Sequence, residues 1–60
     1  MLLNHQIRLL DKFLRDRQDE NLDNFEIAKR IHRHASTMDP VPTHDELNEY
    51  LHSRNMPDVP

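Results

Sequence analysis

The first twenty residues alternate between apolar and polar positions with the period of an α-helix. At about 100° per residue, the apolar residues from Leu2 to Leu14 form one arc of roughly 160°, and polar residues fill the opposite side. This pattern predicts an amphipathic helix over about residues 3–19. Four residues within the arc have the spacing of a coiled-coil seam: Leu3, Ile7, Leu10 and Leu14.

A second helix is predicted over residues 24–36, because its start carries the signals that cap a helix. Asp23 can accept hydrogen bonds from free backbone N–H groups, and Glu26 three residues later can close a capping box. Asn21 can end the first helix in the left-handed conformation, a role that falls to asparagine because the chain has no glycine. The residues expected to face inward are Phe25, Ile27, Ala28, Ile31 and Ala35.

A third helix is predicted over residues 44–54. The preceding stretch, STMDPVP, has two prolines and no periodicity, which is typical of a loop. Thr43 and Glu46 can form a capping box, and Asn55 followed by Pro57 can stop the helix. The apolar stripe of this helix is narrow, so we expect the helix to cover the core as a lid. It contains only Leu47, Tyr50 and Leu51.

Together these elements predict an all-α fold of three short helices. The linker between the first two helices is so short that they should form an antiparallel hairpin, against which the third helix packs. We expect one small helical domain over residues 1–55. Residues 56–60 are predicted to be a mobile C-terminal tail, because they are few and bounded by prolines.

Composition narrows the class of protein further. The chain has no cysteine for a disulfide, and its apolar runs are far shorter than the roughly 20 residues of a membrane span. No signal peptide is evident, so we expect a cytoplasmic protein, in the host cytoplasm if the protein is viral. The net charge is −3, and residues 39–60 hold five acidic residues and one arginine. This balance argues against a general nucleic-acid-coating protein.

The stretch IAKRIHRHAS concentrates positive charge on the second helix. Lys29, Arg30 and Arg33 fall within about 100° of one another on the side opposite the apolar residues, and they are the candidate partner-binding residues. Glu26 lies on the same face, one turn before Lys29 and Arg30, where intrahelical ion pairs can form. The same residues therefore also fit an ordinary solvated face at a helix end.

The histidines and serines give little sign of a metal site or an active site. His32 and His34 lie two residues apart, which on a helix separates them by about 160°, so they cannot hold one ion together. His32 falls at the edge of the apolar arc, where one hydrogen bond would satisfy it. Ser36 and Ser53 have no evident base beside them. We therefore predict no metal site, no cofactor and no enzymatic activity.

The apolar arc of the first helix is wider than the stripe of about 100° that packs on one neighbouring layer. We expect the surplus surface to be buried between two copies of the chain, as a two-fold homodimer. The alternative is a monomer whose three helices cover the arc. The predicted interface is Leu3, Ile7, Leu10 and Leu14, flanked by Leu2, Leu9 and Phe13.

Two resemblances bear on function. The stretch VPTHDELNEYLHSR resembles the first helix of helix-turn-helix and winged-helix repressors, but after Arg54 only six residues with two prolines follow, where those proteins have a recognition helix. The residues that carry this resemblance are Pro42, Thr43, Asp45, Glu46, Leu47 and Leu51. The size of the chain and its helical composition without cysteine or glycine resemble the short early proteins of lambdoid temperate phages. That second resemblance implies an accessory role in modulating the host by binding.

Two functions remain as hypotheses. The leading one is a small, non-catalytic, homodimeric protein–protein interaction module, a phage-type accessory regulator that binds a host protein. The alternative is a DNA-binding transcriptional regulator with a degenerate helix-turn-helix, in which a dimer would present the cations of the second helix twice.

Overall fold

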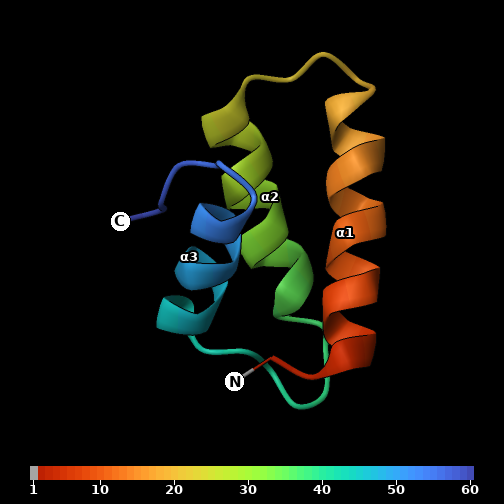
Figure 1. The fold of residues 1–60 in the computed structure, drawn as a ribbon, viewed down its shortest axis with the longest axis vertical. Helices are drawn as coiled ribbons and strands as arrows, with labels where there is room; N and C mark the ends of the chain where they lie inside the picture. The colour runs from red at the N-terminus through yellow and green to blue at the C-terminus, as the bar shows by residue number, and fades with distance from the viewer. Residues whose placement is uncertain (1) are drawn as a thin grey trace.

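The computed structural model describes residues 2–60, which contain three α-helices. Helices α1 (Asn4–Gln18) and α2 (Asn24–Ala35) form an antiparallel hairpin, and α3 (His44–Ser53) packs against α2 and runs in the same direction as α1 (Figure 1). The predicted all-α fold with a third packing helix is confirmed. Each helix begins and ends within one residue of its predicted bounds.

The helix ends follow the capping residues that the sequence indicates. Oδ1 of Asp23 accepts the N–H of Glu26 at 2.9 Å. Thr43 and Glu46 form the predicted capping box, with N···O distances of 2.9 and 3.1 Å. The box predicted for α2 does not close, because the Glu26 carboxylate contacts basic side chains of the next turn. Two asparagines adopt the left-handed conformation after α1 and α3, with φ of 59° and 61°: Asn21 and Asn55.

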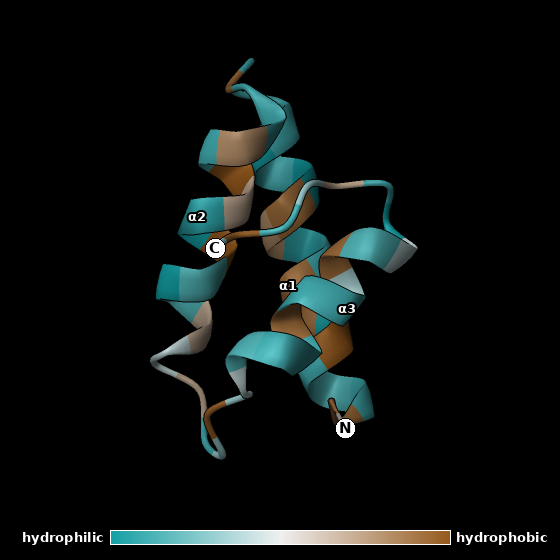
Figure 2. Cartoon of the chain, turned by 90° about the vertical axis from the view of Figure 1, so that its left-hand side faces the viewer, coloured by the Kyte–Doolittle hydropathy of each residue, from teal (hydrophilic) through white to brown (hydrophobic). Residues whose placement is uncertain are grey.

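The apolar sides of all three helices meet in one core. Figure 2 shows hydrophilic residues on the outward surface of α3 and hydrophobic residues toward the interior. The predicted lid role of α3 is wrong, because Leu47, Tyr50 and Leu51 are all buried in this core. Phe25 was expected to face inward but is 42% exposed, and its ring packs under the Lys29 ammonium group instead. The buried apolar residues are Leu10, Leu14, Ile27, Ala28, Ile31, Ala35, Leu47, Tyr50, Leu51 and Met56.

The C-terminal residues join the core rather than leaving it. Met56 is 5% exposed, and its N–H donates a hydrogen bond to the carbonyl of Leu51 at 2.8 Å. Val59 is partly buried against the same core. The left-handed conformation of Asn55 turns the chain back, and Met56 and Val59 pack on the core of the helices.

Gln6 is a polar side chain buried inside the structure. Its Oε1 accepts the N–H of Leu3 at 3.0 Å, and its Nε2 donates to the carbonyl of Pro40 at 2.6 Å. Gln6 therefore closes the start of α1 and ties it to the loop before α3. The sequence offered a signal for this role, because position 6 lies within the apolar arc of the helix wheel.

None of the helices within residues 2–60 combines the length and the apolar composition that crossing a membrane requires.

Candidate functional site

The three basic residues predicted to bind a partner are not equivalent. Lys29 Nζ lies 3.1 Å from Glu26 Oε2 and Arg30 Nε lies 3.4 Å from Glu26 Oε1, which confirms the predicted intrahelical pairs. The hydrogen bond and charge of Lys29, and then those of Arg30, hold the pKa of Glu26 below its ordinary value. Arg33 forms no ion pair with any residue of the described range 2–60. Of the predicted patch, Arg33 is thus the cation that remains for a partner.

Arg33 borders a hollow of about 300 Å³ between α1 and α2, which we name the α1–α2 hollow. Three of its lining residues come from one side of α2, one comes from the turn that follows α2, and α1 supplies the fifth. Because the hollow needs both helices, the sequence pattern of α2 alone does not reveal it. The lining residues are Phe13, Arg30, Arg33, His34 and Thr37.

The wall of the hollow contains a stacked pair of rings from the two helices. The rings of Phe13 and His34 lie 4.4 Å apart between centroids with 9° between their planes. The guanidinium of Arg17 lies 4.7 Å from the Phe13 centroid. Two side chains of the same chain therefore contact the Phe13 ring, which leaves little of it for stacking on a nucleic-acid base.

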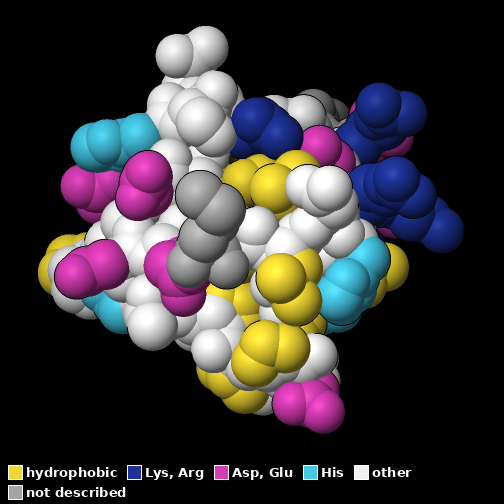
Figure 3. Space-filling model, turned by 60° about the horizontal axis from the view of Figure 1, so that its bottom comes forward, with side chains coloured by type: hydrophobic (Ala, Val, Ile, Leu, Met, Phe, Trp, Pro, Cys, Tyr) yellow, Lys and Arg dark blue, Asp and Glu magenta, His cyan; other side chains and the backbone are white. Residues whose placement is uncertain are grey.

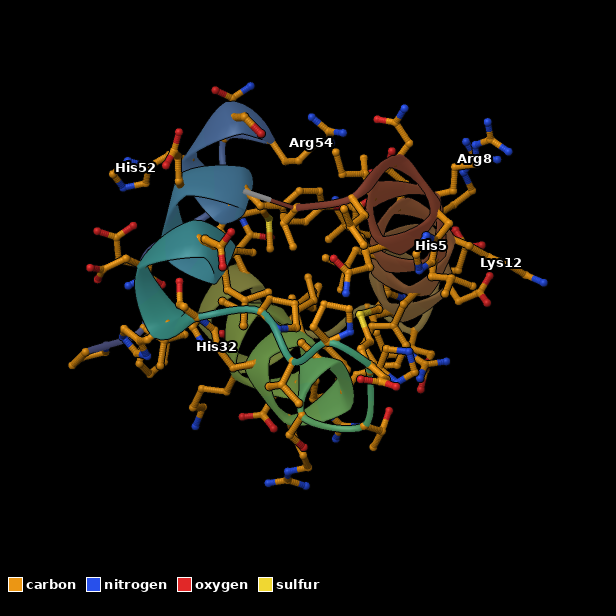
Figure 4. All side chains as sticks on the ribbon, turned by 90° about the horizontal axis from the view of Figure 1, so that it is seen from below. His5, Arg8, Lys12, His32, His52 and Arg54 are labelled. Atoms are coloured by element: carbon orange, nitrogen blue, oxygen red, sulfur yellow. The ribbon has the colours of Figure 1, made fainter. Side chains whose placement is uncertain are left out.

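A second basic surface lies on the outer side of α1, and the sequence analysis did not single it out. Arg8, Lys12 and Arg15 are exposed and fall within about 60° of one another on the helix wheel. Figure 4 shows Arg8 and Lys12, with His5 beside them, pointing away from the other two helices. Within the part of the chain that the structure describes, none of the three cations forms an ion pair. We name His5, Arg8, Lys12 and Arg15 the α1 basic stripe.

The carboxylates nearest to the stripe form no ion pair with its cations within the described residues. Residues 1–20 hold four basic and four acidic residues, so their sequence suggests a neutral helix. In the structure, Asp11 turns toward α3, and its two carboxylate oxygens lie 3.0 and 3.1 Å from the guanidinium nitrogens of Arg54. Asp16 and Asp19 lie toward the C-terminal end of α1. The charge of Arg15 still lowers the pKa of Asp11, but none of these carboxylates forms an ion pair with Arg8, Lys12 or Arg15 among residues 2–60.

Charge is segregated between the two sides of the molecule. Seven of the eight Lys and Arg residues lie on α1 and α2, and Arg54 follows α3. The face in Figure 3 shows Lys and Arg gathered on the side of α1 and most Asp and Glu on the side of α3. Exposed acidic residues of α3 and the tail include Asp45, Glu49 and Asp58. Residues 4–35 hold seven basic and six acidic residues, whereas residues 39–60 hold one basic and five acidic residues, so the excess of negative charge lies with α3 and the segments around it.

The predicted dimer seam does not form one surface. Leu10 and Leu14 are 0% and 7% exposed within a single chain, because the other helices cover this side of α1. Their assignment to an interface between chains is thus corrected, and they belong to the core. Ile7 is partly buried, and Leu3 is 44% exposed. Leu9 is also exposed, but it lies about 120° from Leu3 on the helix wheel, so the two leucines form no continuous face.

A cluster of three polar side chains, Asp11, Tyr50 and Arg54, joins α1 to α3. The Tyr50 hydroxyl donates to Oδ1 of Asp11 at 2.5 Å, and the Arg54 guanidinium lies 4.9 Å from the centroid of the Tyr50 ring. Hydrogen bonding from Arg54, and then from Tyr50, lowers the pKa of Asp11 against the opposing effect of burial. Burial, and then the hydrogen bond to Asp11, raises the pKa of Tyr50. The Asp11 hydrogen bond in turn raises the pKa of Arg54. All three groups are thus engaged in holding two helices together.

His32 has the position that the sequence predicted. It lies at the edge of the core, where its Nε2 and Asn48 Oδ1 are 3.0 Å apart. Its ring also lies 4.7 Å from the ring of His44. Within residues 2–60, no group of three or more His, Cys, Asp or Glu side chains is arranged to hold a metal ion.

A larger hollow of about 400 Å³ lies between the start of α1 and α3. Its wall includes the apolar side chains of Leu2 and Ile7 and the carboxylate of Glu49. The remaining lining residues are Glu46, Tyr50, Ser53 and Arg54. Tyr50 and Arg54 already bind Asp11, and the lining points to no particular ligand, so we assign it none.

Comparisons with known proteins identify no relative of this chain: no family model, curated protein or solved structure matches it. The arrangement of its surfaces is therefore the basis for assigning a function.

Proposed function

We propose that the chain is a small, non-catalytic protein–protein interaction module that binds an acidic surface of a partner protein through the α1 basic stripe. One observation carries this proposal, namely the exposure of Arg8, Lys12 and Arg15 without an ion pair among the described residues. Charges of one sign along a helix raise the association rate with a surface of opposite sign and orient the two partners.

Apolar surface beside the stripe supports a protein partner. Leu9 is 51% exposed and neighbours His5 on the helix wheel. Protein interfaces combine an apolar centre with a polar rim, which this arrangement offers. A phosphate backbone would leave Leu9 without an apolar group to pack on.

The engagement of the reactive side chains supports a non-catalytic role. Asp11, Tyr50 and Arg54 bind one another, and His32 binds Asn48. A substrate would have to displace contacts that hold α1, α2 and α3 together in order to reach these groups. Their side chains therefore serve the fold.

A DNA-binding regulator is the second candidate, because unpaired cations would also contact phosphates. The net charge of −3 and the acidic side formed by α3 and the tail disfavour approach to a polyanion. The covered ring of Phe13 likewise disfavours single-stranded nucleic acid. These features make an acidic protein the better match.

A titration with two probes tests the proposal. One probe is a synthetic amphipathic helical peptide rich in glutamate and leucine, and the other is a short DNA duplex of mixed sequence. We expect the peptide to bind more tightly than the duplex at both about 50 and about 200 mM salt. Replacing Leu9 with Ser should weaken binding of the peptide but not of the duplex, because only a protein partner uses the apolar contact.

A pair of double variants supplies the matched control. Arg8→Gln with Lys12→Gln removes two charges that form no ion pair among residues 2–60, whereas Lys29→Gln with Arg30→Gln removes two charges that are ion-paired with Glu26. We expect the α1 pair to weaken peptide binding about tenfold, equivalent to about 1.4 kcal/mol, and the α2 pair to weaken it much less. Equal losses would contradict the proposal. Tight, salt-steep binding of the duplex that the α1 pair abolishes would favour the DNA-binding candidate.

Four properties stay predictions that rest on the sequence. They are the homodimeric state, the phage-type accessory role, the host-protein partner and the cytoplasmic location.

A further inference from the structure

The end of the chain lies across the side of the molecule that α2 and α3 form. Figure 2 shows the tail leaving the end of α3 and returning over this side. Val59 is held there by its backbone, because its N–H donates to Asn48 Oδ1 at 3.0 Å and its carbonyl accepts from Asn48 Nδ2 at 3.0 Å. The ring of His44 also reaches this carbonyl, with an Nε2···O distance of 2.8 Å. One residue of the tail is thus held through both of its main-chain groups.

These contacts determine the orientation of the side chains that make them. The Asn48 amide must place Nδ2 against the Val59 carbonyl and Oδ1 against the Val59 N–H. Asn48 Oδ1 therefore acts as the acceptor for His32 Nε2, and His32 donates. His44 Nε2 must also donate, since a carbonyl can only accept. The donors and acceptors around Val59 consequently match without conflict.

The Asn48 side chain forms hydrogen bonds with the backbone of the tail, as a neighbouring β-strand does with an extended peptide. Main-chain hydrogen bonds of this kind provide affinity for any extended segment, and the alternating side chains provide selectivity. Here Val59 packs partly into the core, while the Asp58 carboxylate contacts His52 Nε2. Pro60 restricts Val59 to the extended region, which suits this pairing. The resident segment thus consists of an acidic residue, a branched apolar residue and a proline.

The side chains that contact Val59 and Asp58 belong to the helices. His44, Asn48 and His52 lie on α3 at successive turns, and His32 on α2 supports Asn48. The ion pair between His52 of α3 and Asp58 of the tail lies at the surface, because these side chains are 65% and 50% exposed. Met56 is anchored separately by its burial and its bond to Leu51. Residues 57–60 can therefore leave the surface while residue 56 stays in the core.

We propose that His32, His44, Asn48 and His52 form a binding site for an extended peptide segment of a partner protein with the pattern acidic residue, branched apolar residue, proline. Residues 57–60 of this chain are its resident ligand. A partner segment must displace them, and the short connection gives the resident ligand an effective concentration in the millimolar range. This site lies on α2 and α3, so it is independent of the α1 basic stripe.

Binding of a peptide with the sequence of residues 56–60, MPDVP, to the full chain tests this site. The variant Val59→Asp removes the apolar anchor of the resident tail and so lowers the competition. The matched control is Val41→Asp, since Val41 is 58% exposed and lies in the loop before α3. With NMR of the backbone amides of α3 as the readout and peptide up to about 5 mM, we expect Val59→Asp to bind about tenfold more tightly than the wild type or Val41→Asp.

Two further variants show whether the peptide binds at Asn48 or at the α1 basic stripe. Adding Asn48→Ala to Val59→Asp should abolish binding, and circular dichroism shows whether this double variant is still folded. Adding Arg8→Gln with Lys12→Gln to Val59→Asp should leave binding unchanged. No binding to Val59→Asp, equal binding of a peptide with scrambled sequence, or binding that depends on Arg8 and Lys12 instead of Asn48 would overturn the assignment. The last result would place the peptide on the α1 basic stripe and leave the proposed function intact.

Discussion

Asp11 and Arg54 connect the first helix to the end of the third through a two-pronged ion pair, with N···O distances of 3.0 and 3.1 Å. They are 43 positions apart in the sequence. The pair affects both the position of α3 and the charge of α1. It fixes α3 against α1, and it engages both carboxylate oxygens of Asp11, so that Asp11 forms no ion pair with the cations of the α1 basic stripe.

Replacing Asp11 with Asn should make the protein less sensitive to acid. Hydrogen bonds from Arg54 and Tyr50 lower the pKa of Asp11 below its ordinary value of 3.8, so the ionised form stabilises the folded state above that pH. This stabilisation is lost as the pH falls through the folded-state pKa. Because the Asp11 side chain is 43% exposed, we expect a loss of only about 0.5–1 kcal/mol for Asp11→Asn at pH 7.

Urea unfolding at pH 7 and at a pH below 3.8 measures this difference. Asp16→Asn is the matched control, because Asp16 is exposed on the same helix and forms no ion pair with residues 2–60. A wild-type protein that loses no more stability in acid than Asp11→Asn would contradict the prediction.

Tyr50 should ionise only above its ordinary pKa of 10.0 while the protein is folded. Burial and the bond to Asp11 favour the neutral phenol, so this contribution to stability is present below pH 10.0 and is lost as the pH rises further. The chain contains one tyrosine, so near-ultraviolet absorbance reports this group alone. We expect the transition to return to about pH 10 in denaturant. A folded-state transition at the same pH as in denaturant would show that the hydroxyl is not held by Asp11.

Replacing Gln6 with Leu should destabilise the protein although it adds apolar surface. The substitution removes the acceptor for the Leu3 N–H and the donor to the Pro40 carbonyl. We expect a loss of about 1–2 kcal/mol in the free energy of unfolding, measured by thermal or urea unfolding. Gln18→Leu, at an exposed position of the same helix, should stay within about 0.5 kcal/mol of the wild type. Equal effects of the two substitutions would remove the role assigned to Gln6.

Replacing Leu10 with Asp should unfold the chain instead of producing a folded monomer. Leu10 is 0% exposed within one chain, and burying a charge there has no compensating partner. Leu9→Asp should remain folded, because Leu9 is 51% exposed. Far-ultraviolet circular dichroism distinguishes the two results. A folded Leu10→Asp variant would instead return Leu10 to the surface and to the predicted seam.

Light scattering after size exclusion tests the dimer prediction directly. A dimer would have about twice the chain mass of 7.2 kDa. The argument for a dimer rested on a surplus apolar arc, and burial of Leu10 and Leu14 within one chain removes that premise. If the exposed Leu3 and Leu9 hold a dimer instead, Leu3→Asp or Leu9→Asp should convert it to a species with the mass of one chain.

The sequence by itself determined the local structure. Asp23, Thr43, Asn21 and Asn55 define where helices begin and end, and each acts on backbone groups within a few positions of itself. The ion pairs of Glu26 with Lys29 and Arg30 were predictable for the same reason, since helix spacing alone brings them together.

Only the tertiary structure decided which surfaces are free. Helix periodicity shows that an arc is apolar but not how many neighbours cover it, so Leu10 and Leu14 could be placed at an interface until α2 and α3 were seen to enclose them. Counting charges along residues 1–20 likewise gives a neutral segment, because the count cannot show that Asp11 is bound by Arg54. The same limit hid the tail contacts of Asn48, which pair side chain with backbone across 11 positions. Contacts between distant residues depend on how the helices pack, and a single sequence carries no direct measure of that packing.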